Sequence, residues 1–164
     1  MTNKERALMV AEKAHANQTY DIYPYIYHVR QVMQIAESLG YDENIIVSCI
    51  LHDVLEDTDL SYNDIKKAFG KEVAEIVYAV TDELGRNRTE RKLKTLPKIR
   101  SNWKATVVKI CDRIANMTQS KMYNKNLFDM YIKEYDEFYN QLNCQEHPQN
   151  ELTKVWNKLN ELIK

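Results

Sequence analysis

Residues that favour tight turns are scarce in this 164-residue chain, which contains only three glycines and three prolines. Folds rich in strands need many such turns, so the scarcity favours helices. No apolar run approaches the roughly 20 residues that would cross a bilayer, and the first residues lack the apolar stretch of a secretory signal. A formal net charge of −1 gives no general attraction to nucleic acid or to membranes. We therefore expect a cytoplasmic protein with neither kind of partner.

Cysteine is also sparse, with Cys49, Cys111 and Cys144 widely spaced along the chain. An odd number at this spacing indicates neither a disulfide framework nor a structural zinc site. Cys49 and Cys111 lie in apolar segments, which predicts free, buried thiols in a reducing compartment.

What the chain does have is apolar residues that recur at helical spacing along most of its length. Asp42 and Ser61 are placed to cap helices, Gly40 and Gly70 are placed to end them, and Pro24 suits a first helical turn. The expected helices cover residues 2–17, 24–39, 43–53, 61–70, 71–80, 105–117, 126–142 and 148–163. No stretch alternates as a strand does, so the prediction is an all-α helical bundle.

Nothing in the composition divides the chain, and we expect one domain over residues 1–164. Its main part covers about 5–120, and two closing helices cover about 121–164. The closing helices are rich in aromatic residues, which either seal the core or offer a surface for a homo-oligomer. We favour the core for these residues, Tyr131, Tyr135, Phe138, Tyr139 and Trp156.

Four potential metal ligands stand on apolar segments that are expected to pack together. His52 and Asp53 are adjacent in one of them, and His28 and Asp112 lie on two others. Burying imidazole and carboxylate groups is costly unless something pairs with them, and a divalent cation would do so. A set of two imidazoles and two carboxylates suits Mn²⁺, with Mg²⁺, Fe²⁺ or Co²⁺ as alternatives, better than a thiolate zinc site.

Two further carboxylates, Glu56 and Asp57, follow the His-Asp pair by about one helical turn. A cation there would polarise a phosphoryl oxygen and acidify a water, and both carboxylates are placed for general base or acid work. The alternative interpretation makes His28 a core histidine and the two acids solvated side chains at a helix end. His15 and His147 lie on polar segments and are expected at the surface.

The ligand pattern H…HD…D and its surroundings resemble the HD-domain metal-dependent phosphohydrolase superfamily. Within it, the nearest match is the hydrolase domain of the RelA/SpoT-type enzymes and their small stand-alone relatives. These enzymes use Mn²⁺ to remove the 3′-pyrophosphate from (p)ppGpp. The segments that carry the resemblance are Pro24-Tyr-Ile-Tyr-His28, Leu51-His-Asp-Val-Leu-Glu-Asp-Thr58 and Val108-Lys-Ile-Cys-Asp-Arg-Ile-Ala-Asn116.

This resemblance implies roles for particular side chains. The metal ligands would be His28, His52, Asp53 and Asp112. Glu56 and Asp57 would form the catalytic acidic pair, with Glu56 positioning or deprotonating the attacking water. Asn116 would contact the ribose or phosphate, while Lys109 and Arg113 would hold phosphates or pair with the acids.

Substrate recognition departs from the family at one loop. The family usually carries a basic pair shortly before Pro-Tyr-Ile-x-His, whereas residues 18–23 contain no Lys or Arg. Tyr20 or Tyr23 is expected to stack on the base instead. Further on, residues 85–109 contain nine Lys or Arg and one acid. They form either a mobile lid that neutralises substrate phosphates, with Arg86, Arg88, Arg91 and Lys98 favoured, or a solvated helix face.

Three functions are compatible with these residues. The favoured one is a metal-dependent pyrophosphohydrolase acting on (p)ppGpp or a related nucleotide through a metal-activated water. The second is an HD-type 5′-nucleotidase or phosphodiesterase acting on another nucleotide. The third is a non-enzymatic helical module that binds metal and nucleotide. The first two have a small nucleotide as their partner, and the third binds a nucleotide or a partner protein.

Overall fold

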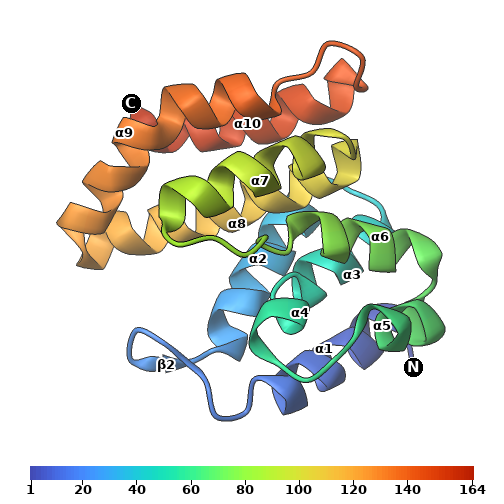
Figure 1. The fold of residues 1–164 in the computed structure, drawn as a ribbon. Coiled ribbons are helices and arrows are strands. Elements are labelled where there is room, and N and C mark those ends of the chain that lie inside the picture. The colour runs from blue at the N-terminus through green and yellow to red at the C-terminus, as the bar shows by residue number, and fades with distance from the viewer.

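The computed structural model describes residues 1–164 and confirms an all-α fold, with one very small β-hairpin (Figure 1). The elements are α1 (Asn3–Ala14), β1 (Thr19–Tyr20), β2 (Tyr23–Pro24), α2 (Ile26–Ser38), α3 (Glu43–Leu51), α4 (Val54–Asp57), α5 (Tyr62–Phe69), α6 (Lys71–Val80), α7 (Arg88–Arg100), α8 (Trp103–Tyr123), α9 (Lys125–Leu142) and α10 (Gln149–Ile163). None of the helices is both long and apolar enough to span a membrane.

Helices α2, α3 and α6 form a layer between α1 and α5 on one side and α7 to α10 on the other (Figure 1). This middle layer buries apolar residues on both of its faces. Helices α2, α3 and α6 turn one face toward α1 and α5, where Val29, Ile50 and Val77 are buried. Their other face packs against α8 and the helices around it, where Val32 and Ile45 are buried. Because α8 is covered on several sides, it is the central helix of the second part of the core.

Helix ends follow the capping residues that the sequence predicts. The side chain of Asp42 accepts a hydrogen bond from the backbone N–H of Ile45 at 2.9 Å and begins α3. Ser61 and Asp64 form a reciprocal capping box at the start of α5. Gly40 follows α2 with a φ of 76°, a left-handed conformation that glycine adopts without steric cost. Each such cap contributes about 1 kcal/mol to the stability of its helix.

The predicted helix over 43–53 is wrong at its end, because α3 stops at Leu51. His52 and Asp53 form a turn, and the four-residue α4 then starts at Val54. The two residues therefore do not lie on a continuous helix. The turn directs both side chains toward α8. On a straight helix the two side chains would point about 100° apart.

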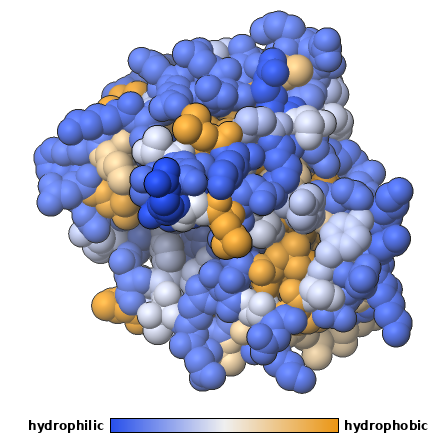
Figure 2. Space-filling view, in the orientation of Figure 1, coloured by the Kyte–Doolittle hydropathy of each residue, from blue (hydrophilic) through white to orange (hydrophobic).

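A hairpin replaces the first helical turn predicted at Pro24. Tyr20 pairs with Tyr23 and Thr19 pairs with Pro24, and Asp21 at the tip has a φ of 53°. The hairpin projects from the start of α2 and stands opposite α7. In the same orientation, Figure 2 shows a largely hydrophilic face that is hollowed between these two segments.

The closing helices seal the core, as predicted. Tyr131, Phe138 and Trp156 are buried, and Phe138 meets Trp156 edge to face with 5.8 Å between ring centroids. Tyr135 and Tyr139 are half-buried against the same cluster. An edge-to-face aromatic pair adds about 0.5–1.5 kcal/mol beyond its buried area.

Candidate metal centre and the adjoining cationic cavity

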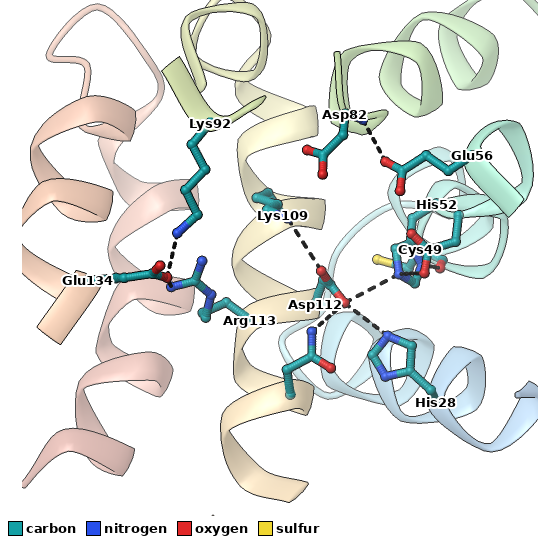
Figure 3. A network of polar contacts seen from close by, with 12 residues as sticks. His28, Cys49, His52, Glu56, Asp82, Lys92, Lys109, Asp112, Arg113 and Glu134 are labelled. Atoms are coloured by element: carbon teal, nitrogen blue, oxygen red, sulfur yellow. Dashed lines mark hydrogen bonds and ion pairs between the residues drawn. The ribbon is translucent and has the colours of Figure 1, made fainter. Parts of the chain in front are cut away.

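His28, His52 and Asp112 converge at one point from α2, the turn after α3, and α8 (Figure 3), and Asp53 lies beside His52. The Nε2 atom of His28 lies 2.9 Å from Oδ1 of Asp112. The Nε2 atom of His52 lies 3.0 Å from Oδ2 of Asp53 and 3.3 Å from Oδ1 of Asp112. Both histidines are almost fully buried. The structure thus brings together all four predicted ligands.

His52 has the orientation that a metal ligand needs. Its Nδ1 lies 2.7 Å from the carbonyl oxygen of Cys49, and since a carbonyl only accepts, Nδ1 carries the proton. Nε2 is then the nitrogen that would present its lone pair to a bound cation; it is buried and has no hydrogen bond of acceptable geometry, although carboxylate oxygens of Asp53 and Asp112 lie close to it. Buried polar atoms are nearly always paired, and a second nitrogen fixed by a carbonyl is the usual arrangement around ligating histidines. This atom and its neighbours therefore fit a cation.

The charges at this point also favour a cation. Burial acts to lower the pKa of His52, but the carboxylates of Asp53 and Asp112 outweigh it and raise the pKa well above the ordinary value. Burial acts to raise the pKa of Asp112, and His52 and His28 instead hold it well below the ordinary value. Lys109 adds a cation 3.6 Å from Asp112. Two partly buried carboxylates thus draw positive charge, which a divalent ion would supply.

A cavity of about 250 Å³ opens beside the four ligands. Its wall comes from the hairpin, α2, α4, α8 and the residues after α6. The lining residues are Tyr20, Tyr25, His28, His52, Asp53, Glu56, Val80, Asp82, Val108, Lys109, Asp112 and Asn116.

Glu56 and Asp57 are separated by the structure, although the sequence suggests a pair. Glu56 lines the cavity, where its Oε1 accepts a hydrogen bond from the backbone N–H of Asp82 at 2.6 Å. Loss of hydration raises the pKa of Glu56 to about 7, and the charges of Asp53 and Asp82 add to the rise. Asp57 is not part of the lining and accepts a hydrogen bond from Gln18 at 3.1 Å.

Asn116 and Tyr20 form one side of the cavity together. The Nδ2 of Asn116 donates to Oδ1 of Asp112 at 3.2 Å, and its Oδ1 accepts from the Tyr20 hydroxyl at 2.7 Å. The Tyr20 ring already stacks on His28, with 4.5 Å between centroids. Tyr23 stacks on Tyr27 instead and lies outside the cavity lining.

Sequence reasoning missed Tyr25 and Asp82 and was wrong about His15. The Tyr25 hydroxyl donates to Oδ2 of Asp53, and the ring is buried. Asp82 lines the cavity and positions Glu56 through its backbone. His15 was expected at the surface, but it is only 3% exposed and packs on Tyr25 with 4.6 Å between ring centroids. Only the position of Tyr25, three residues before His28, offered a signal.

The predicted phosphate-binding cations divide into two groups. Arg88, Arg91, Lys109 and Arg113 line a second cavity, which adjoins the first and shares Asp82 and Lys109 with it. Arg86 lies outside both cavities. Its side chain is 91% exposed and pairs with Glu90, and it lies just before α7 begins. Lys98 also lies outside both cavities and pairs with Glu83. The segment itself is largely α7, which buries Leu96 and Ile99 in the core.

Comparison with known proteins agrees with this architecture. A family model described as "HD domain" matches residues 7–147. The guanosine-3′,5′-bis(diphosphate) 3′-pyrophosphohydrolase MESH1 of Drosophila melanogaster is 37% identical over 97 residues, which cover 57% of this chain and 54% of MESH1. The guanosine-3′,5′-bis(diphosphate) 3′-pyrophosphohydrolase of Aquifex aeolicus is 30% identical over 141 residues, which cover 82% of this chain and 20% of that enzyme.

A solved structure shares nearly the entire fold. It is a metazoan ortholog of SpoT that hydrolyses ppGpp, with a TM-score of 0.80 and 26% identity, and the match covers 99% of this chain and 94% of that one. The chain spans about half the length of the Drosophila relative and a fifth of the Aquifex relative.

Proposed function

The chain belongs to the HD-domain family, and on that premise we propose that it is a metal-dependent hydrolase of pyrophosphorylated nucleotides. The proposed substrate is (p)ppGpp, from which the enzyme removes the 3′-pyrophosphate, or a related nucleotide. Two relatives named for this activity match 57% and 82% of this chain. The small nucleotide is the proposed partner.

The observation that carries the proposal is the convergence of two histidines and two carboxylates beside a cavity that also holds Glu56. The proposed ligands are His28, His52, Asp53 and Asp112. Mn²⁺ is the proposed ion, and Mg²⁺, Fe²⁺ and Co²⁺ suit the same mixture of imidazole and carboxylate. A divalent cation held there supplies Lewis-acid polarisation of the phosphoryl group and lowers the pKa of water.

Glu56 is the proposed general base. One of its oxygens, Oε1, is held by the N–H of Asp82, which leaves Oε2 to take a proton from the attacking water. A pKa of about 7 suits a group that must gain and release a proton near neutral pH. Asp57, whose carboxylate bonds to Gln18, supports the position of the hairpin relative to α4 in this proposal.

Other side chains position the reacting groups. Tyr25 donates to Asp53 and fixes the orientation of that carboxylate. Asn116 is held between Asp112 and Tyr20, so its amide offers a fixed contact for the ribose or a phosphate. Lys109, 3.6 Å from Asp112, is placed to neutralise charge on the pyrophosphoryl group under attack, whose bond to the ribose 3′ oxygen breaks as the water oxygen bonds to phosphorus.

The test is release of phosphate and pyrophosphate by the Mn²⁺-loaded protein from a panel of nucleotides. The panel contains ppGpp, pppGpp, ppApp, GTP, deoxynucleoside triphosphates and nucleoside monophosphates. We expect pyrophosphate from ppGpp and pppGpp. If none of these compounds is turned over although metal is bound, the protein is a non-enzymatic nucleotide-binding module and the proposal fails.

One observation favours a second candidate function, an HD-type 5′-nucleotidase or phosphodiesterase acting on another nucleotide. The hairpin that faces the cavity has no cation in residues 18–23, and Tyr20 is already engaged with His28 and Asn116. Guanine and its phosphates therefore have fewer specific contacts on this side. Phosphate released from monophosphates, without pyrophosphate from ppGpp, would support this second function.

A further inference from the structure

A third cavity, separate from the two beside the metal centre, lies where α2 and α10 pack on either side of α8 (Figure 1). Its volume is about 460 Å³, against about 250 Å³ for the metal cavity. It shares no lining residue with either of the other two. Cavities that hold small molecules in proteins have volumes of roughly 300–1,000 Å³, so its size suits a ligand.

The lining of this cavity combines apolar and polar side chains. Ile35 of α2, Ile114 and Ala115 of α8 and Leu162 of α10 supply the apolar part. Ile114 and Ala115 are buried in the core, so the contribution of α8 is fixed by the packing around it. The cavity therefore offers a place for an apolar group of a ligand.

One polar group in the lining lacks a partner. The Oε1 of Gln31 is buried and accepts no hydrogen bond, while its Nε2 donates to the Tyr27 hydroxyl at 3.3 Å. Buried polar atoms are nearly always paired. A ligand that carries an N–H or O–H donor would supply the missing hydrogen bond.

Two opposite charges from α10 also line the cavity. The Nζ of Lys158 lies 3.6 Å from Oε2 of Glu161, and the two side chains are 45% and 65% exposed. An ion pair at such exposure contributes little to stability, so each charge can turn to a ligand at little cost. A carboxylate is complementary to Lys158, and an ammonium group is complementary to Glu161.

The position of the cavity connects it to the metal centre. Gln31 follows His28 by three residues on α2, and Ala115 follows Asp112 by three residues on α8. Residues three apart are neighbours on a helix surface. A ligand in the cavity thus contacts the two helices that set the 2.9 Å distance between His28 and Asp112.

From these observations we propose that the cavity between α2, α8 and α10 is an effector site for a free amino acid with a large apolar side chain. The carboxylate pairs with Lys158, the ammonium group pairs with Glu161 and offers the donor that Gln31 lacks, and the side chain packs on Ile114 and Leu162. Charge complementarity selects this occupant, because a purely apolar molecule gives these polar groups no partner. Binding there is independent of the proposed function.

Binding is tested with L-phenylalanine, titrated into the isotope-labelled full chain while NMR follows the backbone amide signals. We expect shifts at the lining positions of α2, α8 and α10, with a Kd of about 1 mM, as suits a ligand this small. Absence of shifts at these positions up to about 20 mM would overturn the proposal.

Three smaller compounds are the matched ligand controls. Glycine lacks the apolar side chain, phenylpropionate lacks the ammonium group and phenethylamine lacks the carboxylate. Each is expected to bind at least about tenfold more weakly than L-phenylalanine, because one of the proposed contacts is missing. If phenylpropionate or phenethylamine binds as tightly as the amino acid, the cavity does not recognise both charges and the proposal fails.

Lys158→Gln and Glu161→Gln test the two charges separately, at positions exposed enough to leave the fold intact. We expect each to weaken binding of L-phenylalanine about threefold to tenfold, while Lys158→Arg retains it. The controls are Lys133→Gln and Asp136→Asn, which remove exposed charges of α9 outside the lining. Unchanged affinity in either of the first two variants would overturn the assigned charge pairing.

Gln31→Leu tests the amide. We expect affinity to fall about threefold to tenfold, because the ligand loses an acceptor, without a loss of stability in urea unfolding, because the oxygen removed has no partner in the chain. Unchanged affinity would contradict the contact with Gln31.

The effector role has a separate readout, the affinity for Mn²⁺. We expect saturating L-phenylalanine to change it about fivefold or more, and Mn²⁺ to change the affinity for L-phenylalanine by the same factor. The change should disappear in Lys158→Gln at the same concentration. Equal Mn²⁺ affinities with and without L-phenylalanine would contradict the effector role.

Discussion

The two sides of α8 are opposite in charge although they are built from neighbouring residues. Asp112 faces the cluster of His28, His52 and Asp53, where carboxylates are in excess. Arg113 faces Glu134 on α9, a single carboxylate shared by three cations, so that positive charge is in excess there. Consecutive residues on a helix point about 100° apart. One turn of α8 therefore contributes to two cavities of opposite character.

The difference in charge indicates which counter-charge each side of α8 requires. A buried charge without a partner costs several kcal/mol, and removal of one member of a buried pair is strongly destabilising. On the Asp112 side, a proton on His52 or a divalent ion reduces the excess of negative charge. On the Arg113 side, Glu134 reduces the excess of positive charge only in part. The first side is expected to bind a cation, whereas on the second side Glu134 of the chain itself supplies the anion.

The most severe test of this comparison is to remove a carboxylate from the acidic side. Asp53→Ala should abolish metal binding and reduce turnover by a factor of about 10³ or more, since the ion and its chemistry are lost together. Metal content after dialysis and the rate of pyrophosphate release are the measurements. Asp59→Ala, an exposed acid near α4, is the control. Full metal content in Asp53→Ala would remove that residue from the ligand set.

Glu56→Gln separates chemistry from metal binding on the same side. We expect normal metal content and a kcat about 10²–10⁴-fold lower, because the general base is lost. Since Glu56 must be deprotonated to act, activity should rise with pH through a value between 4.5 and about 7, and a bound cation moves it toward the lower end. Asp57→Asn should change kcat much less. Equal losses in the two variants would restore them as a catalytic pair.

Tyr25→Phe sharpens the comparison, because it removes a hydrogen bond to the proposed ligand Asp53 and leaves all four proposed ligands in place. The phenol donates to Asp53. Loss of such a partner typically reduces metal affinity by about 10–100-fold. Competition with a chelator measures the affinity, and Tyr27→Phe, whose hydroxyl contacts only Gln31, serves as the control. Unchanged affinity would show that the phenol does not orient the carboxylate.

The smallest expected effect concerns stability on the cationic side. The folded pKa of Glu134 is about 2, below the ordinary 4.5, so its ion pairs stabilise the protein above pH 4.5 and are lost as the pH falls toward 2. We expect Glu134→Gln to lower the free energy of unfolding by about 1–3 kcal/mol at pH 7, with allowance for partial solvent screening. In urea unfolding, the difference from the unaltered chain should shrink below pH 4.5. A difference that does not vary with pH would contradict the assigned pKa.

Local signals in the sequence were sufficient for most of the fold. The caps at Asp42 and Ser61 act within three residues of their helices, and apolar spacing reports burial along a single element. The break at His52 gave no such signal, because the apolar pattern continues through it and the turn depends on packing against α8. The hairpin escaped notice because strands of two residues are too short to alternate.

For the site, too, residues with a local signal were predicted and residues that depend on long-range contacts were not. The four proposed ligands were found because His and Asp are conspicuous on apolar segments, and the structure brings them together. Glu134 was hidden in an amphipathic helix, where an acid usually indicates a solvated face. Its ion pairs join it to Arg88, 46 residues away in the sequence, and a contact over that distance leaves no local pattern. Asp82, which contacts Glu56 from 26 residues away, escaped for the same reason.

The position of Asp112 and Arg113 on one rigid helix has a consequence for selectivity. The separation between the two cavities is set by the backbone of α8 and does not depend on any mobile loop. A ligand that contacts both cavities must therefore have charged groups whose separation matches this fixed distance.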